Sequence, residues 1–352
     1  MDDWRKPKTK AKDAFKSFIL KGLSISGRFV EVSKTEKKTA PRETVQFYGH
    51  RIGEIGDTAV HQETRLAFNA TRPDYEISEN LSYSENGMGW SGGRLIEKFS
   101  VHPLRLADFR HQPQQDATII ATCAIVECDY VYSYGDWTHC YLGTILSADF
   151  PDVPVLIPRY LTEKSYVLRD LGKAKINWIA TDGWTNIEHA YVLRKRNPLF
   201  YWSRHDVIAY RKAFDIEPTT PVPGSITYLG RFDLGGETIH RSFPSEVVAK
   251  YITSIGGRVV NQEDLNTETS HNYAEQAEIV IGDHGSGMLN ILFWQPKTVI
   301  ELVVDDWWVN NMIFTAYGMG VENFGVIRVD GLSADAIGEL IKECLESFGR
   351  TP

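Results

Sequence analysis

The stretch at residues 277–304, AEIVIGDHGSGMLNILFWQPKTVIELVV, constrains the fold more than any other part of the chain. Two runs rich in Val and Ile flank a glycine-rich turn, a short apolar segment and a proline. Such runs are typical of buried strands, and the glycines and the proline mark where regular structure stops. The pattern therefore predicts a buried strand, a tight turn, a short helix and a second buried strand of a parallel α/β sheet.

The turn itself, at residues 282–287, reads Gly-Asp-His-Gly-Ser-Gly and stands at a predicted helix start. Gly285 and Gly287 allow the backbone to approach a ligand closely, and backbone N–H groups at a helix start attract anions. His284 can donate to the same anion, and Ser286 can cap the helix or bind a phosphate. We therefore predict an anion site, with a plain strand-to-helix turn and a structural histidine as the alternative.

Two familiar glycine motifs do not fit this turn. The spacing is not the Gly-x-Gly-x-x-Gly of dinucleotide-binding folds. It is also not the Gly-x-Ser-x-Gly of serine hydrolases, because His284 and Met288 occupy the positions that flank Ser286 by two residues. A serine hydrolase is therefore disfavoured.

The rest of the sequence predicts two α/β domains, since 352 residues exceed what one simple core usually takes. Short apolar runs alternate with helical patterns on both sides of residues 216–224, which hold three prolines and a glycine and form the predicted linker. The predicted parts are a basic segment at 1–40, an N-terminal α/β domain at 41–215, a C-terminal α/β domain at 225–330 and an amphipathic helix at 331–352.

The charge of the chain is uneven. Residues 1–40 hold nine Lys and two Arg against five acidic residues, although the whole chain carries a net charge of −8. The overall acidity argues against nucleic-acid binding, whereas a basic segment can rest on an acidic membrane surface; a solvated terminus is the alternative. No apolar run suits a signal peptide or a membrane span. We therefore expect a cytoplasmic protein that can also bind peripherally to the inner membrane face.

The stretch around the turn resembles glycosyltransferase family 61. That family has a strand followed by His-Gly-Ala-Gly, Leu, Asn, a Phe, Pro and a Val-Ile-Glu strand. The residues that match in order are His284, Gly285, Gly287, Asn290, Phe293, Pro296, Ile300 and Glu301. Ser286 replaces the usual Ala, and Arg231 and Arg241 stand in a segment similar to the strand-plus-arginine segment of the family. The clear part of the resemblance covers residues 225–304.

The resemblance implies a GT-B-like fold, in which two Rossmann-like domains face a cleft, and an inverting transfer of a sugar from a nucleotide-sugar donor. By position, His284 and the amides of residues 285–287 hold the donor diphosphate, and Arg231 neutralises its charge. Asn290 and Glu301 orient the turn or bind the ribose, with packing and structural hydrogen bonds as the alternatives. Arg241 has a second donor-binding role, or is a surface arginine.

The chain contains no Asp-x-Asp triplet, so the carboxylate pair that usually clamps a metal ion is missing. We therefore predict a metal-independent reaction without a cofactor. An inverting transfer also needs a general base for the acceptor hydroxyl, which we expect from the first domain, across the cleft. Asp136 stands before Trp137, where the family has a histidine, and is the first candidate; His139 is the second. A structural polar network is the alternative for both.

These observations favour an inverting glycosyltransferase of surface polysaccharide biosynthesis, for example of a capsule or exopolysaccharide. Its partners would be a nucleotide sugar and a glycan or lipid-linked glycan acceptor. Two other classes stay open: a non-catalytic relative that binds a nucleotide sugar or a glycan, and an unrelated α/β nucleotide-binding enzyme.

Overall fold

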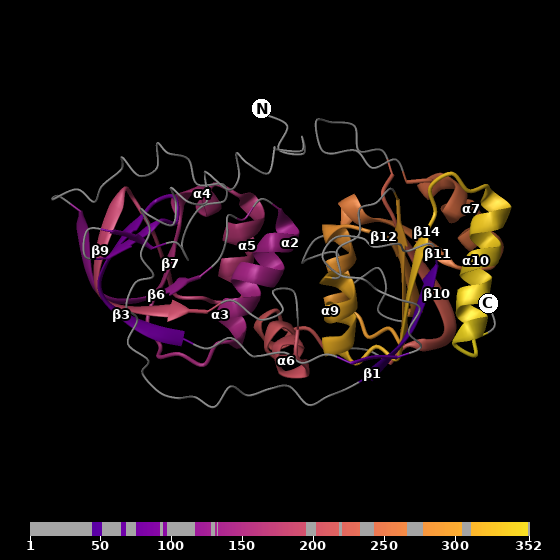
Figure 1. The fold of residues 1–352 in the computed structure, drawn as a ribbon, viewed down its shortest axis with the longest axis horizontal. Helices are drawn as coiled ribbons and strands as arrows, with labels where there is room; N and C mark the ends of the chain where they lie inside the picture. The colour runs from indigo at the N-terminus through magenta and orange to yellow at the C-terminus, as the bar shows by residue number, and fades with distance from the viewer. Residues whose placement is uncertain are drawn as a thin grey trace, which may run out of the picture. The chain divides into compact units, whose positions relative to one another are not determined.

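The computed structural model describes residues 44–50, 65–67, 75–91, 94–96, 117–127, 131, 133–194, 202–217, 220–232, 243–265, 277–304 and 311–350. The described chain divides into two compact units, which Figure 1 shows as separate sheets with their own helices. The first unit contains Asp74–Tyr132 and Ala148–Lys195. The second contains Glu36–Pro73, Ser133–Ser147 and Arg196–Pro352.

The sheet of the first unit is mixed. Its strands are β3 (Tyr75–Ser84), β4 (Gly89–Ser91), β5 (Arg94–Ile96), β6 (Thr118–Val126), β7 (Val155–Ile157), β8 (Trp178–Ala180) and β9 (Trp184–Leu193). Their order is β5-β4-β3-β9-β6-β7-β8. From β9 to β8 the strands are parallel, and β3, β4 and β5 continue the sheet in antiparallel pairs. The helices α4 (Arg159–Thr162) and α5 (Ser165–Lys173) lie between β7 and β8 in the sequence.

The second unit has a sheet of seven strands in a mostly parallel arrangement. These strands are β1 (Thr44–His50), β2 (Arg65–Ala67), β10 (Val222–Gly230), β11 (Arg258–Asn261), β12 (Ala277–Asp283), β13 (Thr298–Val303) and β14 (Asn323–Arg328). The order is β11-β10-β12-β13-β14-β1-β2, and only β2 runs antiparallel to its neighbour. The α/β class that we predicted is therefore confirmed for both units.

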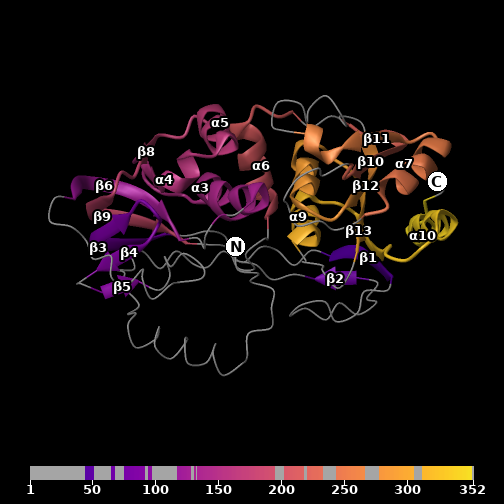
Figure 2. The ribbon, with the colours of Figure 1, turned by 90° about the horizontal axis from the view of Figure 1, so that it is seen from above.

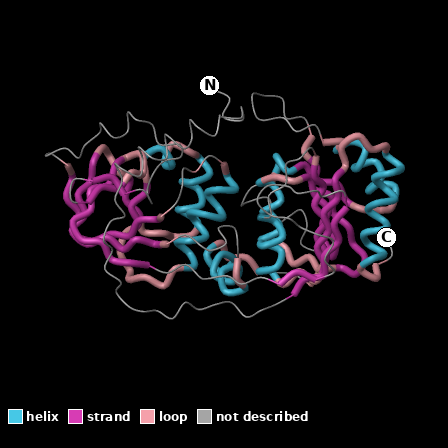
Figure 3. Tube along the Cα trace, in the orientation of Figure 1, coloured by secondary structure: helices cyan, strands magenta, loops and turns pink. Residues whose placement is uncertain are grey.

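Helices cover both faces of this second sheet. The α-helices of the second unit, not all of which lie on its sheet, are α2 (Tyr134–Asp136), α3 (Gly143–Ser147), α6 (Arg204–Ala213), α7 (Ser245–Ser254), α9 (Asn311–Met319) and α10 (Ala334–Ser347). The π-helix η3 (Trp137–Leu142) and the 3₁₀ helices η4 (Gln262–Asp264) and η5 (Ser286–Phe293) complete the set. Figures 1 and 2 both place α7 and α10 on one face and α9 on the other, and Figure 3 shows the strands as the layer between them.

The predicted amphipathic helix at the end of the chain is confirmed as α10. Ser333 is its N-cap, because its hydroxyl accepts a hydrogen bond from the Ala336 backbone N–H at 3.3 Å. Ile337 and Ile341 are buried in a core that α10 and α7 form with the sheet. Gly349 follows the helix with φ +69°, the left-handed conformation that glycine adopts easily after a helix. No helix within the described ranges is long and apolar enough to cross a membrane.

The two units do not follow the predicted domain boundaries. Residues 44–50 and 133–147 belong to the second unit, although we placed both in a first domain at 41–215. The predicted linker at 216–224 is also only partly a linker, because Val222–Gly224 begin strand β10. Pro223 fits there because the pairing of β10 with β12 shifts register between Val222 and Ile226, and such irregularities tolerate a proline.

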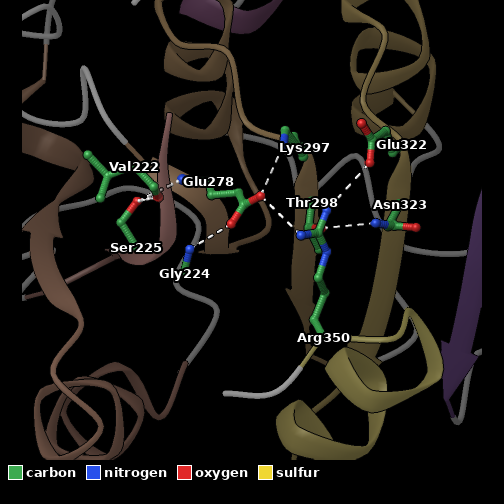
Figure 4. Close-up of polar contacts among 9 residues, drawn as sticks. All are labelled: Val222, Gly224, Ser225, Glu278, Lys297, Thr298, Glu322, Asn323 and Arg350. Carbon is green, nitrogen blue, oxygen red and sulfur yellow. Dashed lines mark hydrogen bonds and ion pairs between the residues drawn. The ribbon is translucent and has the colours of Figure 1, made fainter. Parts of the chain in front are cut away.

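The amino end of β12 carries a network around the buried carboxylate of Glu278 (Figure 4). The Gly224 backbone N–H donates to it at 2.6 Å, and Arg350 donates at 3.0 Å. The Lys297 ammonium lies 3.3 Å from the same carboxylate oxygen as Arg350. The N–H of Gly224, together with Lys297 and Arg350, lowers the pKa of Glu278 although burial opposes the shift. This network joins the last residues after α10 to the sheet.

Candidate functional site

The glycine-rich turn lies at the carboxyl edge of the second sheet, as its place in the sequence predicts. Every residue of β12 is buried, and the strand ends at Asp283. The backbone N–H of His284 then donates to the Leu302 carbonyl of β13 at 2.8 Å, and η5 begins at Ser286. Ligands of open parallel sheets bind beyond this edge, so the turn stands where a donor-binding site is expected. The predicted short helix is a 3₁₀ helix.

His284 and Glu301 form a buried pair at this edge. Nδ1 of His284 lies 2.5 Å from Oε1 of Glu301, and the two side chains are 3% and 0% exposed. Glu301 belongs to β13, where it pairs in register with Gly282. The carboxylate therefore fixes the orientation of the imidazole ring, as carboxylates that hold a functional histidine do. When the ring carries both protons, Nδ1–H donates to Glu301 and Nε2–H remains for an anion.

Arg231 reaches the same turn from the end of β10. Its Nη1 donates to the His284 carbonyl at 3.4 Å, and a Cβ on Gly285 would stand 3.0 Å from that nitrogen. Glycine at position 285 therefore gives the guanidinium room against the backbone of the turn. The resemblance implies that Arg231 neutralises the charge of a donor diphosphate, and the contact places its guanidinium beside the turn; the role itself stays a prediction.

Gln262 and Asn290 hold the backbone of the turn from two sides. Nε2 of Gln262 donates to the Leu229 carbonyl at 2.9 Å and to the Asp283 carbonyl at 2.8 Å. A Cβ on Gly287 would stand 2.4 Å from the Gln262 Oε1, so any larger residue there would force the Gln262 side chain to move. Nδ2 of Asn290 donates to the Gly287 carbonyl at 2.7 Å. The contact of Asn290 is the one expected of a turn-orienting residue, which stays a prediction, whereas Gln262 carries no sequence signal beyond its place just after β11.

Asp283 is a further member of the site that the sequence did not single out. Its carboxylate is fully buried and accepts hydrogen bonds from the Tyr228 hydroxyl, the Arg231 backbone N–H and the Ser245 hydroxyl. Burial raises the pKa of Asp283 to about 6, although the three hydrogen bonds act in the opposite direction. Burial also raises the pKa of Tyr228, and the adjacent carboxylate adds to that shift.

The two candidate bases lie in the same unit as the turn, which differs from the expectation that they come from the other domain. Asp136 closes a capping box at α2: its Oδ2 accepts from the Ser133 backbone N–H and hydroxyl, both at 3.0 Å. A Cβ on the neighbouring Gly135 would stand 2.8 Å from Oγ of Ser286, so α2 packs directly against the turn. The residue directly before Asp136 therefore lies against the turn that is the predicted diphosphate site.

His139 lies deeper than Asp136. The residue is 0% exposed, and its Nε2 lies 2.7 Å from Oγ1 of Thr315 on α9. Its ring also contacts the Trp202 ring, at 5.9 Å between centroids. These contacts put His139 within the packing of η3 against α9, which is a poor position for meeting an acceptor hydroxyl.

Two predicted features are not resolved by this geometry. Arg241 lies outside the described residues. Within the described ranges, no group of three or more His, Cys, Asp or Glu side chains is arranged to hold a metal ion.

The comparisons with known proteins show a similarity to one family. The model of the family described as Glycosyltransferase 61 matches residues 127–300, which include Asp136, Arg231 and the turn. The match indicates a glycosyltransferase. No curated protein matched the sequence. Among solved structures, a mutant flavo di-iron protein from Thermotoga maritima aligns over 95% of this chain and 71% of its own length, with 13% identity and a TM-score of 0.27.

Proposed function

We propose that this chain, a glycosyltransferase by its resemblance to family 61, is an inverting and metal-independent enzyme. It takes a nucleotide-sugar donor and transfers the sugar to a glycan or lipid-linked glycan acceptor in surface polysaccharide biosynthesis. The two α/β units correspond in this proposal to the halves of a GT-B fold, and the second unit binds the donor. The enzyme works on the cytoplasmic side, and the basic residues 1–40 favour contact with an acidic membrane surface that carries the acceptor.

The observation that carries the proposal is the buried pair of His284 and Glu301 at the carboxyl edge of the second sheet. A carboxylate on Nδ1 leaves Nε2 as the nitrogen that can meet a ligand. The Arg231 guanidinium lies against Gly285 in the same turn. A histidine, an arginine and the amides of a glycine-rich turn together suit a diphosphate, which carries negative charge on several oxygens.

The same groups suit the chemistry of the transfer. As the bond between the sugar and the diphosphate breaks, negative charge builds on the leaving diphosphate. Donors that are already fixed in place stabilise that charge without reorganising, and this kind of preorganisation is a large contribution to catalysis. The hydrogen bonds from Gln262 and Asn290 to the turn backbone hold these donors in place. The proposal of a metal-independent reaction rests on the missing Asp-x-Asp triplet.

For the general base we retain Asp136 and rank His139 below it. Asp136 is partly exposed and stands next to Gly135, which packs against Ser286 of the turn. His139 is fully buried against Thr315 and Trp202. In the proposed reaction the Asp136 carboxylate accepts the proton of the acceptor hydroxyl as that oxygen attacks the anomeric carbon.

Donor turnover in the presence of EDTA tests this proposal. Purified protein is incubated with a panel of nucleotide sugars, and nucleotide release is followed by chromatography. We expect release from at least one donor that survives EDTA and that falls about a hundredfold or more in Asp136→Asn, the loss typical of a missing general base. Asp152→Asn, which changes an exposed aspartate in the first unit, is the matched control and should keep full activity.

Two other outcomes decide against the proposal in different ways. Binding of a nucleotide sugar without any turnover would indicate the non-catalytic relative. Turnover that EDTA abolishes and Mg²⁺ or Mn²⁺ restores would rule out the metal-independent mechanism.

A further inference from the structure

Asp283 is a buried carboxylate whose role the proposed chemistry leaves open. The residue precedes His284 directly and is 0% exposed. The Tyr228 hydroxyl lies 2.8 Å from its Oδ1, and Oδ2 accepts from the Ser245 hydroxyl at 2.6 Å and from the Arg231 backbone N–H at 2.9 Å. These donors come from β10, from the segment just after β10 and from the first residue of α7. One carboxylate therefore joins three separate segments at the edge that carries the turn.

The charge of this carboxylate needs an explanation. A negative group so close to a diphosphate site repels the ligand, and a buried carboxylate is costly unless it is well hydrogen-bonded. With a pKa of about 6, Asp283 is mostly ionised at pH 7. Because its oxygens already accept from several donors, the carboxylate is not arranged to bind a ligand itself. Its contacts instead fix the protein groups around it.

The contact that matters most for a ligand is the one with Arg231. Asp283 binds the backbone N–H of this residue, while the guanidinium of the same residue contacts the His284 carbonyl and lies against Gly285. Since Arg231 follows the last residue of β10, its backbone is not part of the sheet ladder. The Asp283 carboxylate therefore accepts the hydrogen bond that fixes the Arg231 backbone directly after the end of β10.

We propose that Asp283 is a positioning residue of the donor site, which holds the Arg231 guanidinium beside the glycine-rich turn by binding the Arg231 backbone N–H and the Ser245 hydroxyl. This inference rests on the proposed function and deepens it, because it names the group that prepares the arginine for the anionic part of the donor. Asp283 acts through Arg231 and does not touch the donor.

The strand itself offers a matched control. Glu278 lies at the other end of β12 and is also a buried carboxylate that accepts from a backbone N–H, as Figure 4 shows. Its other partners, Lys297 and Arg350, have no contact with the turn among the described interactions. Glu278→Gln therefore makes the same chemical change as Asp283→Asn in the same strand, away from the proposed site.

Binding calorimetry with UDP, GDP and CMP tests the inference, using the full chain and the probe that binds wild type best. We expect Asp283→Asn to raise the Kd at least about tenfold and Glu278→Gln to change it less than about twofold, since distant sites do not couple. The decisive reading is a double-mutant cycle with Arg231→Ala. If Asp283 acts through the guanidinium, Asp283→Asn adds nothing to the Kd once the guanidinium is gone.

A loss of stability alone would not produce this pattern, because it would act equally in both backgrounds. Equal affinity of wild type and Asp283→Asn, or a tenfold loss that persists in the Arg231→Ala background, would overturn the inference. If Asp283→Asn does not fold, Tyr228→Phe takes its place in the same cycle, since it removes one of the donors to the carboxylate. If wild type binds none of the three probes, the proposed function fails and the inference with it; if His284→Ala loses binding while Asp283→Asn keeps it, only the inference fails.

Discussion

The two ends of β12 each hold a buried carboxylate, and their surroundings are opposite in character. At the amino end, Glu278 is paired with Lys297 and Arg350 and accepts from the Gly224 N–H. At the carboxyl end, Asp283 accepts from two hydroxyl groups and a backbone N–H. The pKa of Glu278 is lowered, whereas burial raises that of Asp283 to about 6. The amino end of β12 therefore holds a carboxylate that is neutralised by two cations. At the carboxyl end the nearby cation, Arg231, contacts the turn instead of the carboxylate.

The difference teaches how cations are distributed in this unit. At the amino end Lys297 and Arg350 are paired with the Glu278 carboxylate. Their charges stabilise the fold and are not available to bind an anionic ligand. At the carboxyl end the Arg231 guanidinium donates to a carbonyl of the turn at 3.4 Å and forms no ion pair with the described residues, while the carboxylate binds its backbone N–H. Among the described residues, an anion beside Gly285 would therefore meet a positioned cation.

The pH dependence of stability gives the largest expected contrast between the two ends. Asp283 has a folded-state pKa of about 6, above its ordinary value of 3.8, so the folded protein binds this proton more tightly than the unfolded chain. Its contribution to stability is fully present below the unfolded pKa and is lost as the pH rises through 6. The free energy of unfolding of wild type, relative to Asp283→Asn, should increase by about 3 kcal/mol at most between pH 7 and pH 4.

Glu278 should behave in the opposite way. Its folded-state pKa is lowered, so its contribution is present above the unfolded value and is lost as the pH falls through the folded one. Relative to Glu278→Gln, wild type should therefore lose stability as the pH falls below about 4.3, the ordinary value for a glutamate. Urea unfolding of wild type and both variants at a series of pH values measures both trends. If stability relative to Asp283→Asn and stability relative to Glu278→Gln changed with pH in the same direction, the two carboxylates would not differ as described.

Nucleotide binding gives the next largest contrast. His284→Ala removes a hydrogen-bond donor from the proposed diphosphate site and should raise the Kd of the best-binding nucleotide about a hundredfold, a typical loss for a hydrogen bond to a charged group such as a diphosphate. Glu278→Gln should leave the Kd within about twofold of wild type. Isothermal titration calorimetry measures both. Similar losses in the two variants would mean that binding reports the stability of the unit and not the site.

The packing of the turn predicts a moderate effect on stability. A Cβ at position 287 would stand 2.4 Å from the Gln262 Oε1, so Gly287→Ala should lower the free energy of unfolding by about 2 kcal/mol, as overpacking usually does. Gly172 in α5 has open space around it, and Gly172→Ala should raise stability by up to about 1 kcal/mol through helix propensity. Chemical denaturation of the two variants gives these values. A neutral Gly287→Ala would show that Gln262 does not confine the turn.

The smallest expected effects come from two serine variants, one at each end of β12, which should cost similar stability but differ in their effect on nucleotide binding. Ser245→Ala removes a donor to Asp283, and Ser225→Ala removes a hydroxyl that accepts from the Glu278 backbone N–H and donates to the Val222 carbonyl. Each should cost about 1 kcal/mol of stability, the usual net contribution of one hydrogen bond. Only Ser245→Ala should also weaken nucleotide binding. Equal binding by both serine variants would remove the link between the Asp283 network and the ligand.

The second sheet was largely predictable because its signals are local. Buried runs, a glycine turn and a proline define β12, the turn and β13, and a clear N-cap and helical spacing define α10. No sequence pattern predicts the helix α9, because its residues are apolar on nearly every side and show little periodicity. In the parallel pair of β1 and β14, Phe47 lies opposite Phe324. No local sequence pattern predicts a pairing between strands so far apart in the sequence.

The site was predictable where the residues carry a motif, and less so where the fold assembles them. The turn itself predicts His284, the resemblance adds Glu301 and Arg231, and the structure brings the three together. Asp283 looked like one more turn residue because its three donors come from other segments. The sequence predicts Asp136 and His139 in a contiguous first domain, across a cleft from the turn, whereas residues 133–147 belong to the unit that carries the turn.

The central claim is that the turn at His284 binds the anionic part of a nucleotide-linked donor. A thermal-shift measurement on wild type, His284→Ala and Glu278→Gln, each with a panel of nucleotide sugars, tests it directly, because a ligand of the folded state raises the melting temperature. We predict that at least one nucleotide sugar stabilises wild type and Glu278→Gln alike and leaves His284→Ala unchanged. No stabilisation of wild type by any nucleotide sugar, or equal stabilisation of His284→Ala, would contradict the claim.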